Sequence, residues 1–353
     1  MGNAVIESEL LCWLRSTFSG EALSSLALVA GDASPRRYYR LALGTDGTRR
    51  SIIAAISPPT EKNLEFIAVR QLLAEAGVRV PELYAFDLDR GFLALEDLGD
   101  ATLLPRLNDD SVDRFYGAAL DHLLGLSHIK IANSGLPHYS RELLQGELNV
   151  FMDWFVIGLL AVNPTHNAQQ TAQMRSKFAG LSDVLISSAL SQPQVLVHRD
   201  FHSRNLMVLT QEQLAVIDFQ DAVIGPITYD PVSLLKDCYI AWPRAQQLAW
   251  LSQYRQRLLK AELIAPVTAE AFIRWFDLMG LQRHIKVLGV FARLNLRDNK
   301  PVYLADLPLV LHYIREALAL YRNDIKEITE FESWFEEALM PPIIRQAWFH
   351  PPV

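Results

Sequence analysis

Four polar residues in one short stretch have the types and the spacing that phosphoryl transfer requires. His198, Asp200 and Asn205 follow an apolar run, and Asp218 comes thirteen residues after the asparagine. Transfer of a phosphoryl group needs an acidic side chain that accepts the proton of the attacking hydroxyl, and oxygen ligands that hold Mg²⁺ on the nucleotide phosphates. Asp200 suits the first task, and Asn205 and Asp218 are hard oxygen ligands that suit Mg²⁺. We expect His198 to support the loop that carries Asp200.

Two apolar segments, at 206–209 and 214–217, are expected to position these side chains, and a polar turn at 210–213 separates them. Apolar segments joined by a short polar turn are typical of a β-hairpin. A hairpin would hold Asn205 at the start of one strand and Asp218 at the end of the next, so the two side chains would converge. A surface hairpin with chance acidic residues is the alternative, and four matching positions in order disfavour it.

The same stretch resembles a known family. HRDFHSRN followed by IDFQ is similar to the motifs of the aminoglycoside phosphotransferase and choline kinase family, the small-molecule branch of the protein-kinase-like fold. His202, and Gln220 in place of the glycine of D-F-G, favour this branch over protein kinases. Within it, the chain is similar to bacterial kinases that phosphorylate the anomeric hydroxyl of N-acetylmuramate and N-acetylglucosamine in peptidoglycan recycling. The stretches that carry this similarity include GDASPRRYYRL, DRGFLALEDLGD, IDFQDAVIGPITYDPVSLLKD and QRHIKVLGVFARL.

The resemblance implies an α+β fold of two lobes. Residues 1–97 would form a β-rich N-lobe that binds ATP, and residues 98–353 a mainly helical C-lobe with the acceptor pocket. It further implies ATP and Mg²⁺ as cofactors and a small-molecule amino sugar as acceptor. A kinase of another small hydroxyl acceptor, such as an aminoglycoside, choline or an amino alcohol, is the alternative.

The nucleotide side of the site is expected in the N-lobe. The turn in GDASPRRYYRL resembles the loop that covers nucleotide phosphates, where backbone N–H groups and cations neutralise charge. Its candidate phosphate-binding residues are Ser34, Arg36 and Arg37. A plain hairpin with a solvated basic strand is the alternative reading of this turn. The segment that resembles the hinge between the lobes, whose backbone would bind adenine, comprises Glu96, Asp97 and Leu98.

One feature of the family is missing from the N-lobe. A lysine on the strand expected at 50–56 would bind the α- and β-phosphates, but the sequence there is RSIIAAI. Arg37 and Lys62 are candidates for its replacement. Glu65 lies where a glutamate would pair with that lysine, and we interpret it as a solvated acidic residue. The missing lysine leaves open a catalytically inactive pseudokinase.

The acceptor side is expected in the helical lobe. The long helix expected at 269–295 carries Arg283, Lys286 and Arg293 at near-helical spacing. A basic face suits an acidic sugar, because a carboxylate is bound best by a cation. A solvated surface is the alternative interpretation. A cationic acceptor would need an acidic pocket, so these residues disfavour it.

Three acidic residues complete the candidates. Glu147 lies in an aromatic-rich segment that could bind a sugar, although an amphipathic core helix is the alternative. Asp221 follows the metal-ligand motif and is a second candidate for substrate contact. The family resemblance gives Asp230 a structural role, in which its carboxylate bonds the backbone of the catalytic loop.

Composition limits the remaining classes. The chain has 353 residues, 50% of them hydrophobic, and a net charge of −7, which is ordinary for a globular protein and disfavours a nucleic-acid partner. No apolar run reaches the roughly 18 residues of a membrane span, and acidic residues stand where a signal peptide needs positive charge. We therefore expect a cytoplasmic monomer without a membrane partner, in which Cys12 and Cys238 are buried free thiols.

Overall fold

The structure is a computed structural model that describes residues 2–29, 35–44, 50–162 and 168–350. Two compact units divide the chain, and each contains two segments: Met1–Asn108 with Arg204–Ala222, and Asp109–Ser203 with Val223–Val353. We call them unit 1 and unit 2. The predicted combination of a β-rich part and a mainly helical part is confirmed. The lobe boundary expected between residues 97 and 98 stays a prediction. The hairpin with Asn205 and Asp218 belongs to unit 1.

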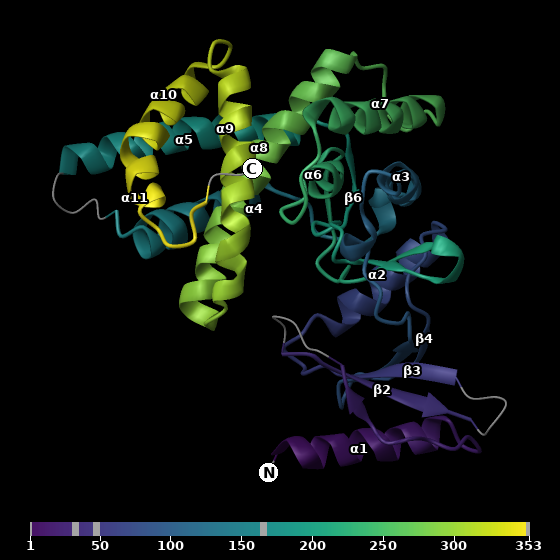
Figure 1. Ribbon diagram of the computed structural model, residues 1–353. Helices are drawn as coiled ribbons and strands as arrows, with labels where there is room; N and C mark the ends of the chain where they lie inside the picture. The colour runs from purple at the N-terminus through teal and green to yellow at the C-terminus, as the bar shows by residue number, and fades with distance from the viewer. Residues whose placement is uncertain (1, 30–34, 45–49, 163–167, 351–353) are drawn as a thin grey trace. The chain divides into compact units, whose positions relative to one another are not determined.

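Unit 1 is built on a five-stranded antiparallel sheet in the order β1-β2-β3-β5-β4 (Figure 1). Its strands are β1 (Ala27–Leu28), β2 (Arg37–Leu43), β3 (Arg50–Ile56), β4 (Leu83–Asp87) and β5 (Phe92–Glu96). Its helices are α1 (Gly2–Thr17), α2 (Asn63–Glu75) and the 3₁₀ turn η1 (Leu104–Arg106). The hairpin consists of β7 (Leu206–Val208), the turn η5 (Thr210–Glu212) and β8 (Leu214–Val216). The strand predicted at 50–56 is confirmed as β3.

One face of this sheet packs on α1. Side chains alternate between the two faces of a strand, so Ile52 and Ala54 of β3 point the same way, and both are fully buried. They form an apolar core with Leu10, Trp13 and Leu14 of α1. Burial of each large apolar side chain stabilises the fold by about 1.5–3 kcal/mol. This core holds the sheet that carries the candidate nucleotide-binding residues.

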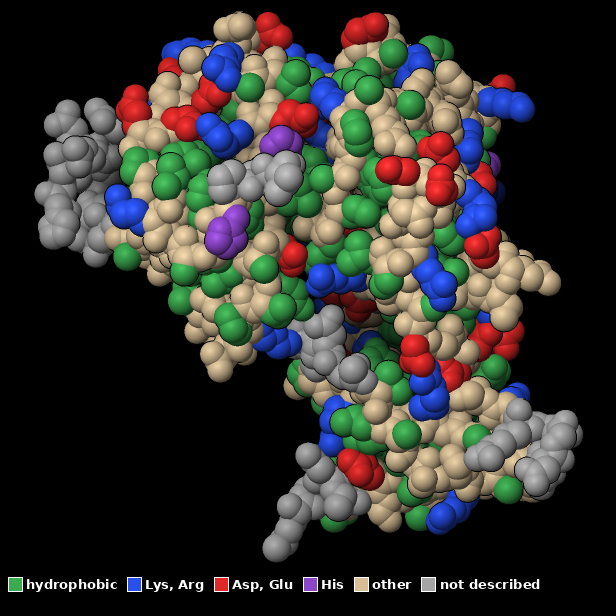
Figure 2. All heavy atoms as spheres, viewed as in Figure 1, with side chains coloured by type: hydrophobic (Ala, Val, Ile, Leu, Met, Phe, Trp, Pro, Cys, Tyr) green, Lys and Arg blue, Asp and Glu red, His purple; other side chains and the backbone are tan. Residues whose placement is uncertain are grey.

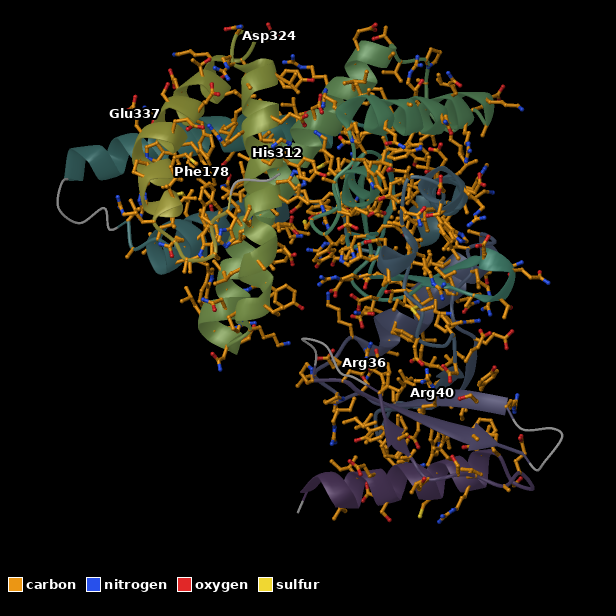
Figure 3. The ribbon with its side chains drawn as sticks, in the orientation of Figure 1. Arg36, Arg40, Phe178, His312, Asp324 and Glu337 are labelled. Atoms are coloured by element: carbon orange, nitrogen blue, oxygen red, sulfur yellow. The ribbon has the colours of Figure 1, made fainter. Side chains whose placement is uncertain are left out.

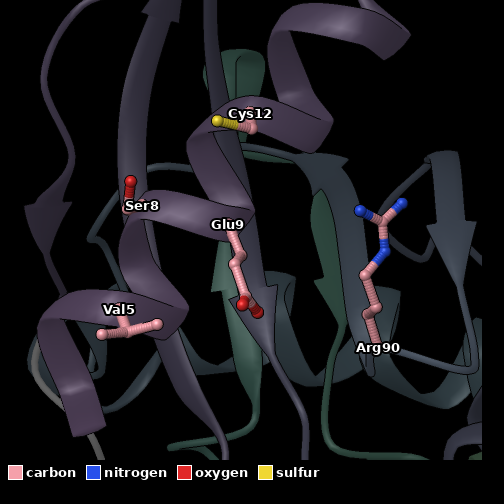
Figure 4. Close-up of a pocket in the computed structure, with 5 residues that line it drawn as sticks. All are labelled: Val5, Ser8, Glu9, Cys12 and Arg90. Carbon is pink, nitrogen blue, oxygen red and sulfur yellow. The ribbon is translucent and has the colours of Figure 1, made fainter.

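The outer face of α1 carries Cys12, which is exposed, so the prediction of a buried thiol is wrong here and right for Cys238. A helix advances about 100° per residue, which places Cys12 on the side opposite to the buried Leu10 and Leu14. A surface groove of ≈ 760 Å³ lies along this side (Figure 4), lined by Val5, Ser8, Glu9, Cys12 and Arg90. None of the predicted site residues lines this groove.

The start of α2 differs from the prediction. Thr60, followed by an apolar-periodic stretch and then Gly77, predicts a helix that starts at residue 61 with Thr60 as its cap, but α2 begins at Asn63, and no side chain caps it. The Asn63 amide donates to the Ser57 carbonyl at 3.2 Å instead, so a contact with the end of β3 sets the helix start. The end is as predicted, because Gly77 adopts the left-handed φ of 76° that stops the helix.

Unit 2 is mainly helical. Its α-helices are α3 (Val112–His128), α4 (Arg141–Val150), α5 (Ala168–Leu190), α6 (Tyr229–Leu235), α7 (Arg244–Lys260), α8 (Ala269–Asp298), α9 (Leu307–Tyr321), α10 (Lys326–Trp334) and α11 (Met340–Ile344). The other helical segments are η2 (Ile131–Asn133), the π-helix η3 (Phe151–Leu159), η6 (Pro301–Asp306) and the π-helix η7 (Phe335–Leu339). Two strands, β6 (Gln194–Val197) and β9 (Val223–Pro226), pair antiparallel. In the described ranges, no helix combines the length and the apolar character that crossing a membrane requires.

Helix α8 is the centre of unit 2. It packs on α4, η3, α5, α6 and α9, and it is buried on nearly all sides between Phe276 and Gly289. A helix that is enclosed on every side belongs to a core rather than a surface. In the view of Figure 2, acidic and basic side chains are interspersed on the outer helices. Within the enclosed span of α8, by contrast, Asp277 and Arg283 are buried and Lys286 is only partly exposed, unlike an ordinary solvated basic face.

Gly289 allows the closest approach in this core. A Cβ atom at this position would lie 2.5 Å from the Val150 carbonyl group and from the Phe151 nitrogen, at the junction of α4 and η3. No side chain fits in that space, because the neighbouring atoms belong to the backbone. The contact fixes the register of α4 against α8, and with it the level at which Glu147 meets Lys286.

We predict that Gly289→Ala lowers the free energy of unfolding by about 1–3 kcal/mol, because the added methyl group overpacks a backbone contact. Gly280→Ala is the matched control on the same helix, since its Cβ would meet nothing closer than 3.7 Å. The control should be neutral or slightly stabilising, because alanine favours helix over glycine. Urea unfolding of both variants measures the difference, and equal stabilities would contradict the prediction.

Candidate active site

The hairpin of unit 1 brings the two predicted magnesium ligands together. Strands β7 and β8 pair with Leu206 opposite Val216, and the Ile217 N–H donates to the Asn205 carbonyl at 3.1 Å. Asn205 and Asp218 therefore lie at adjacent strand ends, with Asn205 Nδ2 3.4 Å from Asp218 Oδ2. The expected hairpin is present, and the two side chains converge.

Asp218 is held from several directions. Its backbone is left-handed, with a φ of 66°, and Gln220 Nε2 donates to its Oδ1 at 2.9 Å. The next residue, Phe219, is fully buried and stacks on Phe66 of α2, with ring centroids 4.9 Å apart. In the sequence, Gln220 is a marker of the family resemblance only. Its amide orients the carboxylate of Asp218.

The donor set at the hairpin fits Mg²⁺. Asn205 and Asp218 supply an amide and a carboxylate oxygen, which are hard donors. Within the part of the chain that the structure describes, no three His, Cys, Asp or Glu residues cluster as a metal site. A pair of oxygen ligands suits Mg²⁺, which keeps waters and binds chiefly through substrate phosphates.

The catalytic loop in unit 2 is anchored at both ends by buried carboxylates. Asp230 accepts hydrogen bonds from the His198 N–H at 2.7 Å and from the Arg199 N–H at 3.0 Å. Asp237 accepts from the Ser203 N–H at 2.9 Å and from its hydroxyl at 2.5 Å. The family resemblance implied the contact of Asp230. Asp237 was missed, and its only signal was a second aspartate at the end of PVSLLKD.

Asp200 is the carboxylate of this loop that is accessible to a ligand. Its side chain is 44% exposed, and its Oδ1 lies 3.6 Å from Nη2 of Arg283. Packing by itself raises the pKa of Asp200, but Arg283 and then Lys286 outweigh this effect and hold the pKa below its usual value. His198 is buried, and its Nδ1 lies 3.3 Å from the Asp200 backbone nitrogen. Asp200 is therefore an anion whose backbone is fixed.

The acidic and basic candidates of unit 2 form one cluster. Glu147 accepts from Lys286 Nζ at 2.8 Å, from Arg199 Nη2 at 2.5 Å and from the Tyr139 hydroxyl. Burial raises the pKa of Glu147, but the two cations outweigh it and lower the pKa to about 2. Arg283 donates to the Arg199 carbonyl at 2.6 Å. Glu147, Arg283 and Lys286 are thus brought together, and Glu147 is satisfied by protein groups.

Arg199 links this cluster to the catalytic loop. The family resemblance would place a glycine at this position, and the sequence has an arginine. Its φ is 77°, a left-handed conformation that costs a residue with a Cβ about 1–2 kcal/mol. Its guanidinium pairs with Glu147 and lies 5.5 Å from the centroid of the Tyr139 ring. The ion pair and the ring contact offset the strain.

The predicted phosphate-binding residues of unit 1 differ in their surroundings. Ser34 lies outside the described residues. Arg37 is half-buried and lies 3.6 Å from the Glu7 carboxylate of α1. Arg36 precedes β2 (Figure 3) and is only 3% exposed. Its Nε donates to Ser57 Oγ at 2.8 Å, and its Nη2 lies 3.4 Å from Asn63 Oδ1.

Lys62 and Asp221 form an ion pair in unit 1. Lys62 Nζ lies 2.6 Å from Asp221 Oδ1, and both side chains are exposed. The pair joins the residue before α2 to the segment after Asp218. Glu65 is exposed on α2, as its interpretation as a solvated residue predicts.

The hinge candidates keep their side chains occupied. Glu96 pairs with Arg79, and Asp97 accepts from Arg40 Nε at 2.6 Å and from the Ser51 hydroxyl at 2.5 Å. Neither carboxylate is left over for a ligand. Binding of adenine by the backbone of this segment, including that of Leu98, stays a prediction.

The two units and these motifs define a kinase-like phosphotransferase. Residues 25–275 match the family described as the phosphotransferase enzyme family, and the chain belongs to that family. An ethanolamine kinase of Plasmodium vivax, at 11% identity, has a similar fold, with a TM-score of 0.59 over 82% of this chain and 81% of that one.

Two curated relatives are more similar in sequence. An N-acetylmuramate/N-acetylglucosamine kinase of Pseudomonas putida is 42% identical over 87% of this chain and 87% of its own length. A kinase of the same name from Pseudomonas aeruginosa is 39% identical over 91% of this chain and 94% of its own length. The resemblance noted from the sequence is confirmed.

The contact of Asp230 with the loop predicts a pH dependence. Burial raises the pKa of Asp230 to about 6, although His198 and the two backbone donors act against it. A protonated carboxyl group cannot accept from both N–H groups, so kcat should fall as the pH drops through about 6. The proton binds the folded state more tightly than the unfolded one, so this group's contribution to stability increases over the same range. The fall therefore should not reflect unfolding.

The measurement is kcat at saturating substrates against pH, with circular dichroism at each pH. Asp230→Asn mimics the protonated carboxyl group. We therefore expect this variant to have a low kcat that lacks the acidic limb, which is the fall in kcat as the pH drops through about 6. Asp237→Asn leaves Asp230 in place and should retain the limb. An unchanged acidic limb in Asp230→Asn would assign it to another group.

Proposed function

We propose that this protein transfers the γ-phosphoryl group of ATP to the anomeric hydroxyl of N-acetylmuramate and N-acetylglucosamine. The observation that carries the proposal is the anchored loop with Asp200, an exposed carboxylate kept ionised beside Arg283. The names of the two Pseudomonas relatives support this choice of acceptor.

In the proposed reaction, the anomeric oxygen attacks the γ-phosphorus of ATP, and the bond from that phosphorus to the β,γ-bridging oxygen breaks. ADP leaves with the bridging oxygen, and Asp200 takes the hydroxyl proton. Phosphoryl transfer passes through a loose transition state, so positioning of the hydroxyl matters more than the strength of the base. The ring oxygen makes an anomeric hydroxyl more acidic than an ordinary alcohol. A weak base such as Asp200 is matched to that acceptor.

Asn205 and Asp218 would hold Mg²⁺, which neutralises charge on the nucleotide phosphates when bound. Gln220 keeps the Asp218 carboxylate oriented through its bond to Oδ1. Buried Phe219 fixes the backbone beside it against Phe66. These contacts preorganise the donors before any ligand arrives.

The charge around Asp200 favours an acidic or neutral acceptor. Burial raises the pKa of Asp200, but Arg283 and Lys286 hold it down. The buried carboxylates of Asp230 and Asp237 accept hydrogen bonds from the loop backbone. Glu147 is already bonded by Lys286, Arg199 and Tyr139, so it is not available to a cationic ligand. Choline and aminoglycosides are cations and would need an acidic pocket. Because these carboxylates are already bound by protein donors, they do not form the acidic pocket that a cation needs, which supports an amino sugar.

The decisive experiment measures ADP release with ATP and Mg²⁺ against N-acetylmuramate, N-acetylglucosamine, choline and kanamycin. We expect turnover with the two amino sugars only, giving an acid-labile anomeric phosphate. Asp200→Ala and Asp218→Ala should each lose at least about 10²-fold in kcat, whereas Asp183→Ala, an exposed aspartate of α5, should retain activity. Turnover of choline or kanamycin would overturn the acceptor. Binding of ATP without any turnover would instead support a pseudokinase.

We propose that Arg36 binds the α- and β-phosphates in place of the missing lysine. Its guanidinium meets Ser57, directly after β3, and Asn63, at the start of α2. It also lies 5.2 Å from the centroid of the Phe66 ring. Burial raises the pKa of Tyr38, Arg36 lowers it, and Asp218 raises it. Arg36 and the magnesium ligand Asp218 therefore both lie near the Tyr38 hydroxyl. A guanidinium binds phosphate oxygens well, because its planar fork matches their geometry.

This assignment predicts a selective loss of affinity. Arg36→Ala should weaken ATP and ADP binding by about tenfold to a hundredfold, because a charge-assisted contact is removed, and leave adenosine binding unchanged. Arg36→Lys keeps the charge and should lose less. Arg37→Ala is the matched control, because its side chain pairs with Glu7. Calorimetric titration provides the affinities, and a parallel loss for ATP and adenosine would mean that Arg36 is structural only.

A further inference from the structure

A row of residues on one side of helix α8 contacts α4 and η3. Lys286 pairs with Glu147, Gly289 touches the Val150 backbone, and a Cβ on Gly158 would lie 3.0 Å from Leu296. Helix α8 and the continuous segment formed by α4 and η3 therefore run in the same direction along this contact. Arg293 lies between the second and third of these contacts.

Arg293 is on the same side of α8 as Lys286. Seven residues correspond to nearly two full turns, so the two side chains leave the helix in almost the same direction, about 10 Å apart along its axis. Lys286 has Glu147 and Tyr229 as partners. The next basic residue, Arg297, pairs with Asp298 at 2.7 Å.

Arg293 differs from its neighbours because no hydrogen bond or ion pair to it is found among the described residues, and its Nε is buried. Burial and the nearby Arg297 lower the pKa of Arg293. A guanidinium that is partly withdrawn from water without a partner is unfavourable. An anion brought by a ligand would remove that cost.

The position of Arg293 relative to Asp200 suits binding of the acceptor. Arg283, which lies 3.6 Å from Asp200, precedes Arg293 by ten residues on the same helix, or about 15 Å of rise. Helical side chains tilt towards the N-terminus, so Arg293 reaches back along α8. The lactyl group of N-acetylmuramate leaves the ring two carbons from the anomeric carbon and carries a carboxylate at its far end. N-acetylglucosamine has a hydroxyl there and no charge.

We propose that Arg293 binds the lactyl carboxylate of the acceptor and thereby favours N-acetylmuramate over N-acetylglucosamine. This inference rests on the function proposed above. The segment η3, which packs on α8, supports it, because π-helical turns are frequent at functional sites. Arg293 would thus be a specificity residue and would take no part in proton transfer.

The test compares kcat/KM for the two sugars in four proteins: wild type, Arg293→Ala, Arg293→Lys and Arg297→Ala. For Arg293→Ala we expect a loss of about tenfold to a hundredfold with N-acetylmuramate, mainly through KM because the contact is remote from the reacting atoms. With N-acetylglucosamine the change should be under about threefold. Arg293→Lys keeps the charge without the bidentate geometry and should lie between. Arg297→Ala should change neither sugar.

A methyl ester of the lactyl carboxylate gives an independent readout. Wild type should treat this ester like N-acetylglucosamine, and Arg293→Ala should not discriminate between the ester and the free acid. An unchanged ratio between the two sugars, or an equal loss with both, would overturn the role of Arg293. Absence of turnover with either sugar in the wild-type protein would instead overturn the proposed function, so the two failures are distinguishable.

Discussion

The backbone of the catalytic loop is held by two buried carboxylates, and the reacting groups of unit 2 depend on them. Asp230 and Asp237 are 4% and 2% exposed, and together they bind the N–H groups of His198, Arg199 and Ser203. Hydrogen bonds to a charged acceptor contribute about 1.5–3 kcal/mol each. A loop with a residue at positive φ cannot rely on regular secondary structure, so these carboxylates determine where Asp200 stands.

The position of Asp237 depends in turn on a buried ion network. Lys236 is 1% exposed, and its Nζ lies 3.3 Å from Asp277 and 3.2 Å from Glu316. Arg244 also binds Asp277, at 2.6 Å. Breaking a buried ion pair by removal of one partner costs about 3–5 kcal/mol. Because Lys236 and Asp237 are consecutive, this network at α8 and α9 also fixes the end of α6 beside the loop.

Local features of the site could be predicted from the sequence. The hairpin of Asn205 and Asp218 depends on two apolar segments and one turn, all within a short stretch, and it formed as expected. Strand β3 and the stop of α2 at Gly77 were also predictable, because a short apolar run and a helix-ending glycine are local signals. The cap at Thr60 was not, since a contact with the end of β3 sets the start of α2.

Features that join distant segments could not be predicted. Ser57 lies 21 positions from Arg36, and Glu147 lies 52 positions from Arg199. Asp237 lies 34 positions from Ser203. Nothing in the neighbouring residues marks such pairs, because each forms only when the chain has packed. Arg36 and Glu147 were therefore predicted as candidates without their partners, and Asp237 was missed.

Arg199 shows how one substitution affects the whole acceptor side. Glycine would adopt its φ of 77° without strain, but glycine would leave Glu147 with one cation fewer in a buried site. The arginine completes the charge balance of Glu147 and adds to the positive potential that keeps the pKa of Asp200 low. An anion stabilised in this way is a weak base, and the same potential repels cationic acceptors. The strained residue thus favours an acceptor whose hydroxyl is acidic and whose charge is zero or negative, a combination found in N-acetylated amino sugars with a free anomeric hydroxyl.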